Sequence, residues 1–173
     1  MPQNLELKVP IASLAAAERI AHRLGAQYAA TLHQKDTYYN VKSGRLKLRE
    51  ILDDHAELIY YRRPNICGGK YSQYTILSID DPKTIHDILM GALGTLVVVQ
   101  KKRRLYLFDN ARIHLDHVKE LGTFLEFEVV IEHGKPQARA LFQQLCKAFC
   151  IQHTESLQYS YCDLLLQAKK KKN

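Results

Sequence analysis

Two stretches of the chain alternate strictly between charged and apolar residues. In Arg45-Leu46-Lys47-Leu48-Arg49 every second residue is basic, whereas in Glu126-Phe127-Glu128-Val129 every second residue is acidic. A period of two is typical of β-strands, because successive side chains point to opposite faces of a sheet. One solvated face is the commonest cause of such alternation. Acids and bases nevertheless occupy different strands here, which favours charged faces that meet one another rather than water.

The rest of the periodicity predicts about eight strands, largely consecutive in sequence, and four helices. Short links between neighbouring strands favour antiparallel pairing, so the fold class is α+β, built on an antiparallel sheet or barrel. Helices are expected at 13–24, with Ser13 as N-cap and Gly25 as stop, from Pro82 to Gly91–Gly94, at 136–149 and at 155–168. Strands are expected around Leu5 and Leu7 and at 28–39, 45–51, 56–63, 71–79, 95–108, 111–118 and 123–132, with turns that include 43–44, 53–54 and 67–69.

The charged strand faces have a chemical consequence if the sheet curves around them. A closed barrel of about eight strands has little room inside, and unpaired cations there would be very costly. Such an interior makes sense only if an anion fills it and the acids hold a divalent metal that bridges to the same anion. A polyphosphate with magnesium or manganese meets both demands.

Composition narrows the function classes. The net charge of the 173 residues is +7, but Lys169–Lys172 supply four of these charges, so the remainder is only about +3. A strongly basic nucleic-acid binder is therefore not favoured. No apolar run approaches the roughly 18 residues that span a bilayer, so no membrane partner is expected. Four cysteines without paired spacing indicate reduced thiols and a cytoplasmic location.

Several motifs, in this order, resemble the CYTH domains, also called triphosphate tunnel metalloenzymes. Asn4-Leu5-Glu6-Leu7-Lys8 is similar to the ExExK signature that opens these domains. It is followed by Gly44 to Glu50, Gln100 to Arg104, His114 to Val118 and Glu126-Phe127-Glu128. The resemblance runs from about residue 4 to 166. It is most similar to the class IV adenylyl cyclase branch and to thiamine triphosphatase-like proteins.

The resemblance implies a fold and a site. The fold would be a closed eight-stranded antiparallel β-barrel, or tunnel, with helices packed outside. It would form one domain at 1–168, followed by a disordered lysine-rich tail at 169–173. The cofactor would be Mg²⁺ or Mn²⁺. Residue by residue, the catalytic residues would be Lys8, Lys47 and Arg49; the substrate-binding residues Lys8, Arg45, Lys47, Arg49, Arg62, Lys101 and Arg103; and the metal ligands Glu6, Asp116, Glu126 and Glu128.

One departure from the family pattern bears on activity. The first glutamate of the signature is Asn4 here, which can still offer a neutral oxygen to a metal or its water but removes one negative charge. Three functions stay open: a metal-dependent hydrolase of an organic or inorganic triphosphate, a class IV-type adenylyl cyclase, and a non-catalytic binder of phosphate compounds. Hydrolysis is preferred, because cyclisation also needs a positioned adenosine. The expected partner is a triphosphate-containing small molecule, with a homodimer as one option.

Three other signals carry less weight. Lys101 to Tyr106 could form a nucleic-acid patch, but the near-neutral remainder of the domain argues against it. Cys146 and Cys150 lie near His153, although buried free thiols on an amphipathic helix are far commoner than zinc. His114 and His117 flank Asp116, and are expected to be partly exposed, because no nucleophile signature accompanies them.

Overall fold

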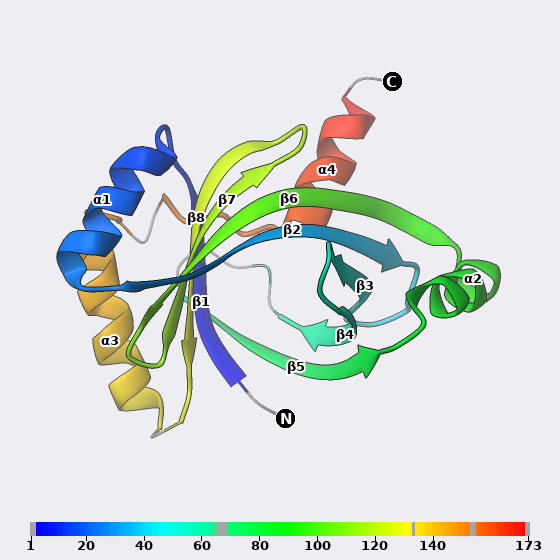
Figure 1. Ribbon diagram of the computed structural model, residues 1–173, viewed down its shortest axis with the longest axis horizontal. Coiled ribbons are helices and arrows are strands. Elements are labelled where there is room, and N and C mark those ends of the chain that lie inside the picture. Colours follow the sequence, from blue (N-terminus) through cyan, green and yellow to red (C-terminus); the bar gives the residue numbers. More distant parts are fainter. Residues whose placement is uncertain (1–2, 64, 66–68, 133, 153–154, 172–173) are drawn as a thin grey trace.

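The computed structural model describes residues 3–63, 65, 69–132, 134–152 and 155–171. Its eight strands form a closed barrel in the order β1-β5-β4-β3-β2-β6-β7-β8, and every pairing is antiparallel (Figure 1). This confirms the predicted fold class. The strands are β1 Gln3–Pro10, β2 Gln27–Tyr39, β3 Arg45–Ile51, β4 Ala56–Arg62, β5 Lys70–Ile79, β6 Thr95–Phe108, β7 Ala111–Val118 and β8 Gly122–Val130. The described helices are α1 Leu14–Leu24, α2 Pro82–Leu93, α3 Lys135–Ala148 and α4 Tyr161–Lys170.

The first strand shows how alternation sorts side chains between the interior and the outside of the barrel. Asn4, Glu6 and Lys8 line the interior cavity. Leu5 and Leu7 lie on the opposite face, in a buried hydrophobic cluster. Because the closed barrel gives each strand one inner and one outer face, the polar residues of β1 meet those of β8 rather than solvent.

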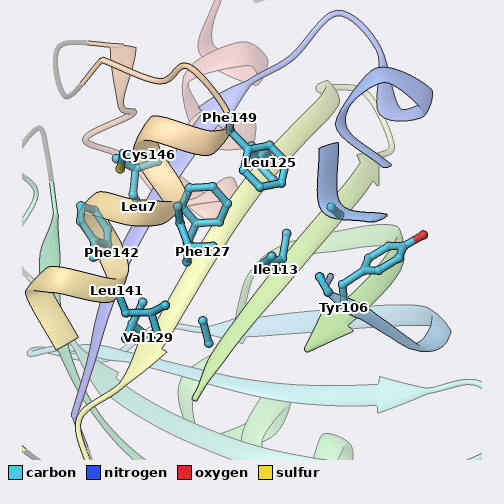
Figure 2. Packing of buried hydrophobic residues seen from close by; sticks show 14 of the residues in the cluster. Leu7, Tyr106, Ile113, Leu125, Phe127, Val129, Leu141, Phe142, Cys146 and Phe149 are labelled. Carbon is cyan, nitrogen blue, oxygen red and sulfur yellow. The ribbon is translucent and has the colours of Figure 1, made fainter. Parts of the chain in front are cut away.

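Helices α1 and α3 cover the outer face of β1, β7 and β8 (Figure 1). Figure 2 shows Phe127 of β8 and Leu7 of β1 pointing toward α3, where Phe142 and Phe149 meet them. The rings of Phe127 and Phe149 have centroids 5.2 Å apart. Complete burial of one such side chain stabilises the fold by about 1.5–3 kcal/mol. This packing on the outer face of the strands therefore also fixes the position of their inner face.

The ends of α1 follow the predicted signals. The Ser13 side chain accepts a hydrogen bond from the backbone N–H of Ala16, at 3.2 Å. Gly25 has a φ of 86°, a left-handed conformation that glycine adopts without strain, and it ends the helix.

The last helix begins later than expected. It runs from Tyr161 to Lys170 rather than over 155–168, because Ser160 and Asp163 form a capping box that fixes its first turn. Lys169 and Lys170, assigned above to a disordered tail, are helical, and cations are favourable near a helix C-terminus. Residues 172–173 of that tail, and 67–68 of the turn expected at 67–69, lie outside the described residues.

Helix α4 packs against β6 (Figure 1). Its Tyr161 and Leu165 belong to a buried cluster with Val97, Val99 and Phe124. On β6 these valines share a face with Lys101, so α4 covers the same interior that the charged residues line. No helix in the described ranges has both the length and the apolar character needed to cross a membrane.

Candidate functional site

A cavity of about 210 Å³ lies inside the barrel. Among the described residues that line it, seven are basic and five acidic, so the wall has a surplus of positive charge. Eight of the predicted site residues meet here: Glu6, Lys8, Lys47, Arg49, Lys101, Arg103, Glu126 and Glu128. The other lining residues are Asn4, Asp36, Tyr38, Glu57, Ile59, Tyr61, Arg63, Ser72, Tyr74, Ile76, Arg112, Ser160 and Tyr161.

The basic side of the cavity is organised around Asp36 of β2, which is 1% exposed. Its Oδ2 accepts hydrogen bonds from Lys47 of β3 at 2.9 Å and from Lys101 of β6 at 2.8 Å. Arg49 donates to Oδ1 at 2.8 Å and to Oδ2 at 2.9 Å. One carboxylate thus faces three cations, and this trio forms a ready-made site for an anion.

Burial shifts the proton affinities in this basic cluster. It lowers the pKa of Lys101 to about 7, because the nearby cations Arg49 and Arg103 add to desolvation and outweigh the attraction of Asp36. It lowers the pKa of Lys47 to about 8 in the same way. For Asp36, burial would raise the pKa, but Arg49, Lys101 and Lys47 outweigh it and hold the value well below the ordinary range.

The opposite side of the cavity is acidic and comes from β1, β7 and β8. Glu126 pairs in register with Lys8 on β1 and with His114 on β7. The Nζ of Lys8 lies 3.2 Å from Glu126 Oε1 and 3.7 Å from the centroid of the Tyr161 ring. Coulombic attraction to Lys8, His114 and Arg103 outweighs burial and keeps the pKa of Glu126 well below its ordinary value.

His114 lies beside these acidic residues. It is 3% exposed, so the expectation of a partly exposed residue is wrong. It lies on the inner face of β7, whereas His117 lies on the outer face and is exposed. One ligand atom from each of His114, Glu126 and Glu128 lies within 4.8 Å of the other two. A nitrogen and two carboxylate oxygens at this spacing can hold a metal ion.

Asn4 and Glu6 extend the oxygen donors along β1. The Oδ1 of Asn4 is buried in the cavity wall and has no hydrogen-bond partner among the described residues. A buried acceptor without a donor is costly unless something else satisfies it, and a metal or its bound water would do so. Burial raises the pKa of Glu6, with Glu126 and Glu128 adding to the effect and Arg63 opposing it. The donor set therefore fits a divalent metal.

Asp116 was expected to bind the metal, but it is not among the residues that line the cavity. Both of its oxygens accept from Arg103, at 2.8 and 2.7 Å, and Oδ2 also accepts from the Tyr161 hydroxyl at 2.8 Å. Arg103 in turn donates to Glu126 at 2.7 Å. Asp116 thus lies behind Arg103 and orients its guanidinium, because an arginine fork matches a carboxylate in two parallel hydrogen bonds.

The structure places Arg63, not Arg62, inside the barrel. Arg62 is exposed and donates to the Tyr60 hydroxyl at 2.8 Å. The Arg63 side chain is 4% exposed and donates from Nη1 to Glu6 at 2.8 Å. Its Nε and Nη2 are buried without a partner among the described residues. The correction follows from alternation, since Arg63 directly follows β4 and lies two residues beyond Tyr61, which lines the cavity.

Arg45 lies at one end of the tunnel rather than in the inner cavity. It contacts Asp163 of α4 at 2.7 Å and Asn65 at 3.0 Å. Together with Arg62 it lines a second cavity of about 860 Å³, which adjoins the inner one through Tyr38 and Arg63. A third cavity, of about 1030 Å³, adjoins the inner one through Lys101. Each of these two cavities thus shares at least one lining residue with the inner one.

Three residues of the candidate site escaped the sequence reasoning: Asp36, Arg63 and His114. Each occupies the same strand face as a residue that was identified or that lines the cavity. Asp36 is two residues from Tyr38, and His114 is two residues from Asp116. A consistent count of every second residue along the strands would have found them.

Comparisons with known proteins agree with this architecture. The CYTH domain family model matches residues 2–156. A protein of Pyrococcus horikoshii OT3 superposes with a TM-score of 0.82 at 19% identity, over 93% of this chain and 98% of its own. A proposed adenylate cyclase from Vibrio parahaemolyticus gives 0.74 at 17% identity, over 94% and 97%. A proposed adenylyl cyclase from Hippeastrum with a dominant triphosphatase activity gives 0.63 at 15%, over 93% and 91%. No curated protein matches the chain by sequence.

Proposed function

The chain belongs to the CYTH domain family, and from that premise we propose that it is a divalent-metal-dependent phosphohydrolase acting on a triphosphate. The observation that carries this proposal is the division of one buried cavity into two sides. Three cations converge on Asp36 on one side, and Glu126, Glu128 and His114 gather on the other. A polyphosphate chain with a bound cation matches both.

The basic residues bind and orient the phosphates. Lys47, Arg49 and Lys101 bind one part of the polyphosphate. They share a single counter-ion, the Asp36 carboxylate, and therefore keep a net positive charge toward the cavity. Arg63 offers a phosphate oxygen two donors, Nε and Nη2, that have no partner among the described residues. These groups are in place before the reaction, so they stabilise the charge that develops on the transferred phosphoryl group without reorganising.

The middle of the cavity joins the two sides. Arg103 is held by Asp116 and donates to Glu126, so its position is set before substrate arrives. Lys8 lies beside Glu126, where its ammonium can contact a phosphate oxygen next to the metal. Both cations offset negative charge where phosphate and carboxylates approach each other.

The acidic side would hold the metal through Glu126, Glu128 and Glu6, with the Asn4 amide oxygen as a neutral donor. A bound Mg²⁺ or Mn²⁺ polarises phosphate oxygens and lowers the pKa of a water. Asp116 is assigned the positioning of Arg103 and not a direct ligand role. The loss of one carboxylate at Asn4 leaves three acids in the cavity wall near the metal, which is sufficient for one such ion.

A class IV-type cyclase remains the second candidate. The cavity of about 1030 Å³ beside Lys101 offers room for a nucleoside next to the phosphate site. The Vibrio relative is a proposed cyclase, whereas the Hippeastrum relative, also a proposed cyclase, has a dominant triphosphatase activity. Hydrolysis is preferred because it needs the triphosphate site alone.

A product assay separates these functions. The purified protein is incubated with tripolyphosphate, ATP or thiamine triphosphate and with Mg²⁺ or Mn²⁺, and the products are separated by chromatography. Release of orthophosphate supports the hydrolase, and cyclic AMP with pyrophosphate supports the cyclase. Tight binding without turnover of any substrate would leave only a phosphate-binding module. Glu126→Gln serves as the inactive control.

A further inference from the structure

We propose that His114 is a direct nitrogen ligand of the metal, and that the site therefore prefers ions that accept nitrogen, such as Mn²⁺, Fe²⁺, Co²⁺ or Zn²⁺, over Mg²⁺. The inference rests on the metal site in the proposed function. It concerns one residue that the sequence reasoning set aside, and it names the chemical class of the ion.

The first support is the position of the imidazole. His114 Nδ1 lies 3.4 Å from Glu126 Oε2 and 3.9 Å from Glu128 Oε1. It faces Glu126 directly across the β7–β8 ladder, so the strand register holds the ring beside both carboxylates. A separation of 3.4 Å is long for a hydrogen bond, so Nδ1 lies close to the carboxylates without being tightly bonded to either.

The second, independent support is the buried amide oxygen of Asn4 on β1. Asn4 is 5% exposed, and its Oδ1 has no hydrogen-bond partner among the described residues. It lines the same cavity as Glu126 and Glu128. On the adjacent β8, Asn4 faces Val130, two residues beyond Glu128. At this position Asn4 Oδ1 is suited to be the fourth ligand of the same ion, or to contact a water bound to that ion.

The donor chemistry decides the class of ion. Mg²⁺ demands oxygen donors and near-octahedral geometry, and it loses its waters reluctantly. Imidazole suits the first-row transition ions, whose affinity for such sites generally rises from Mn²⁺ through Fe²⁺ and Co²⁺ to Cu²⁺ and is lower again for Zn²⁺. At Asn4 a neutral amide stands where the family signature has a glutamate, which lowers the charge that would attract a hard ion. Both features of this chain shift the site in the same direction.

The main test measures metal binding directly. Metal-stripped protein is titrated with Zn²⁺, Mn²⁺ and Mg²⁺ in a competition assay with a chelating dye, and the same titrations are made on His114→Asn. In this variant an amide oxygen lies near the position of the imidazole Nδ1, so an oxygen donor replaces the nitrogen donor. We expect the wild type to bind Zn²⁺ and Mn²⁺ more tightly than Mg²⁺, and the variant to lose at least tenfold of this preference. Circular dichroism confirms that both proteins are folded.

His117→Asn is the matched control, because it removes an exposed imidazole from the outer face of the same strand. It should leave the ratio of the Zn²⁺ and Mg²⁺ affinities unchanged. If His114→Asn leaves that ratio unchanged as well, the proposal is overturned. Hydrolysis of tripolyphosphate with Mg²⁺ by such a variant would then show that the proposed function stands while the ligand assignment fails.

A second measurement uses the unaltered protein and so does not depend on the folding of a variant. Crystals grown with Mn²⁺ should give an anomalous difference peak within roughly 2.3 Å of His114 Nδ1 and near the carboxylates of Glu126 and Glu128. A peak on the carboxylates with the imidazole more than about 3 Å away would overturn the proposal.

Discussion

The ammonium of Lys101 on β6 lies 2.8 Å from the Asp36 carboxylate on β2, and neither side chain is more than 2% exposed. Asp36 does not neutralise Lys101 alone, because Lys47 and Arg49 contact the same carboxylate. The pair is therefore a buried ionic contact with too little negative charge for the cations around it. An anion entering the cavity would supply what is missing, and the first two predictions follow from this relationship.

Phosphate binding should depend on pH near neutrality. The pKa of Lys101 is lowered to about 7 by burial, so in the free protein the side chain is charged below that pH and increasingly neutral above it. A bound anion favours the charged form, so affinity should fall as pH rises from 7 to 9. Binding at pH 8 should take up a proton. Calorimetry with tripolyphosphate in two buffers of different ionisation enthalpy measures this uptake.

Lys101→Gln is the control for this pH dependence. It removes the titrating amine of Lys101 but leaves the protonation of tripolyphosphate unchanged. The uptake should shrink in the variant, with a remainder from Lys47, whose pKa is lowered to about 8. Equal uptake by both proteins would refute the assignment. Stability has the opposite sign: unfolded Lys101 binds a proton up to its ordinary pKa of 10.5, so folding becomes more favourable as pH rises from about 7 to 10.5.

Asp36→Asn should destabilise the free protein and increase its response to ligand. Removing one partner of a buried ion pair costs about 3–5 kcal/mol, because uncompensated charge is left behind. Tripolyphosphate should restore part of this loss, so its effect on the melting temperature should be larger in the variant than in the wild type. Scanning calorimetry at matched ionic strength measures both. Lys169→Gln combined with Lys170→Gln, in the last turn of α4, should leave the response of the melting temperature to tripolyphosphate unchanged.

Glu126→Gln and Glu128→Gln should each reduce kcat by at least about a hundredfold while leaving the fold intact, since a direct metal contact contributes several kcal/mol to transition-state stabilisation. Steady-state rates with tripolyphosphate and far-ultraviolet circular dichroism measure the two effects. Glu132→Gln, an exposed glutamate just after β8, is the matched control and should keep wild-type rates. Full activity in the double variant of the two buried glutamates would mean that the metal lies elsewhere.

Arg63→Gln should raise KM for tripolyphosphate by at least tenfold, because it removes two guanidinium donors of the cavity wall that have no partner within the described part of the chain. Arg62→Gln changes the neighbouring residue in the same way, but that side chain is exposed and contacts Tyr60. Its effect on KM should stay below about twofold, since exposed charges are screened by solvent. The reverse order of effects would mean that Arg62, and not Arg63, contacts the substrate.

Asn4→Glu should tighten metal binding, because it adds a carboxylate beside Glu6 and Glu128. The concentration of Mn²⁺ or Mg²⁺ needed for half-maximal activity should fall. If the enzyme is weakened by Asn4, turnover should rise as well; if the site is adapted to an amide, the added charge should repel phosphate and slow the reaction. Unchanged metal dependence together with an unchanged rate would show that Asn4 does not contact the metal.

The strands, their antiparallel pairing and the charged character of the barrel interior could be predicted from the sequence alone. Alternation on β1, β3 and β8 is local, and it separated Glu6 and Lys8 from Leu5 and Leu7 without any knowledge of the partners. The motif order also identified the family. These inferences hold because side-chain direction along a strand depends only on whether positions are an even or odd number apart.

Which charges meet could not be predicted, because it depends on how the barrel closes. Asp36 and Lys101 are 65 residues apart, and Arg103 bridges Asp116 and Glu126 only because β6, β7 and β8 are neighbours at one particular register. The same register buries His114 opposite Glu126. Contact energies between buried charges depend on separation and on exclusion of water, and both arise when the barrel closes. A local pattern therefore predicts which face a residue occupies, whereas the closed barrel sets its partner and its pKa.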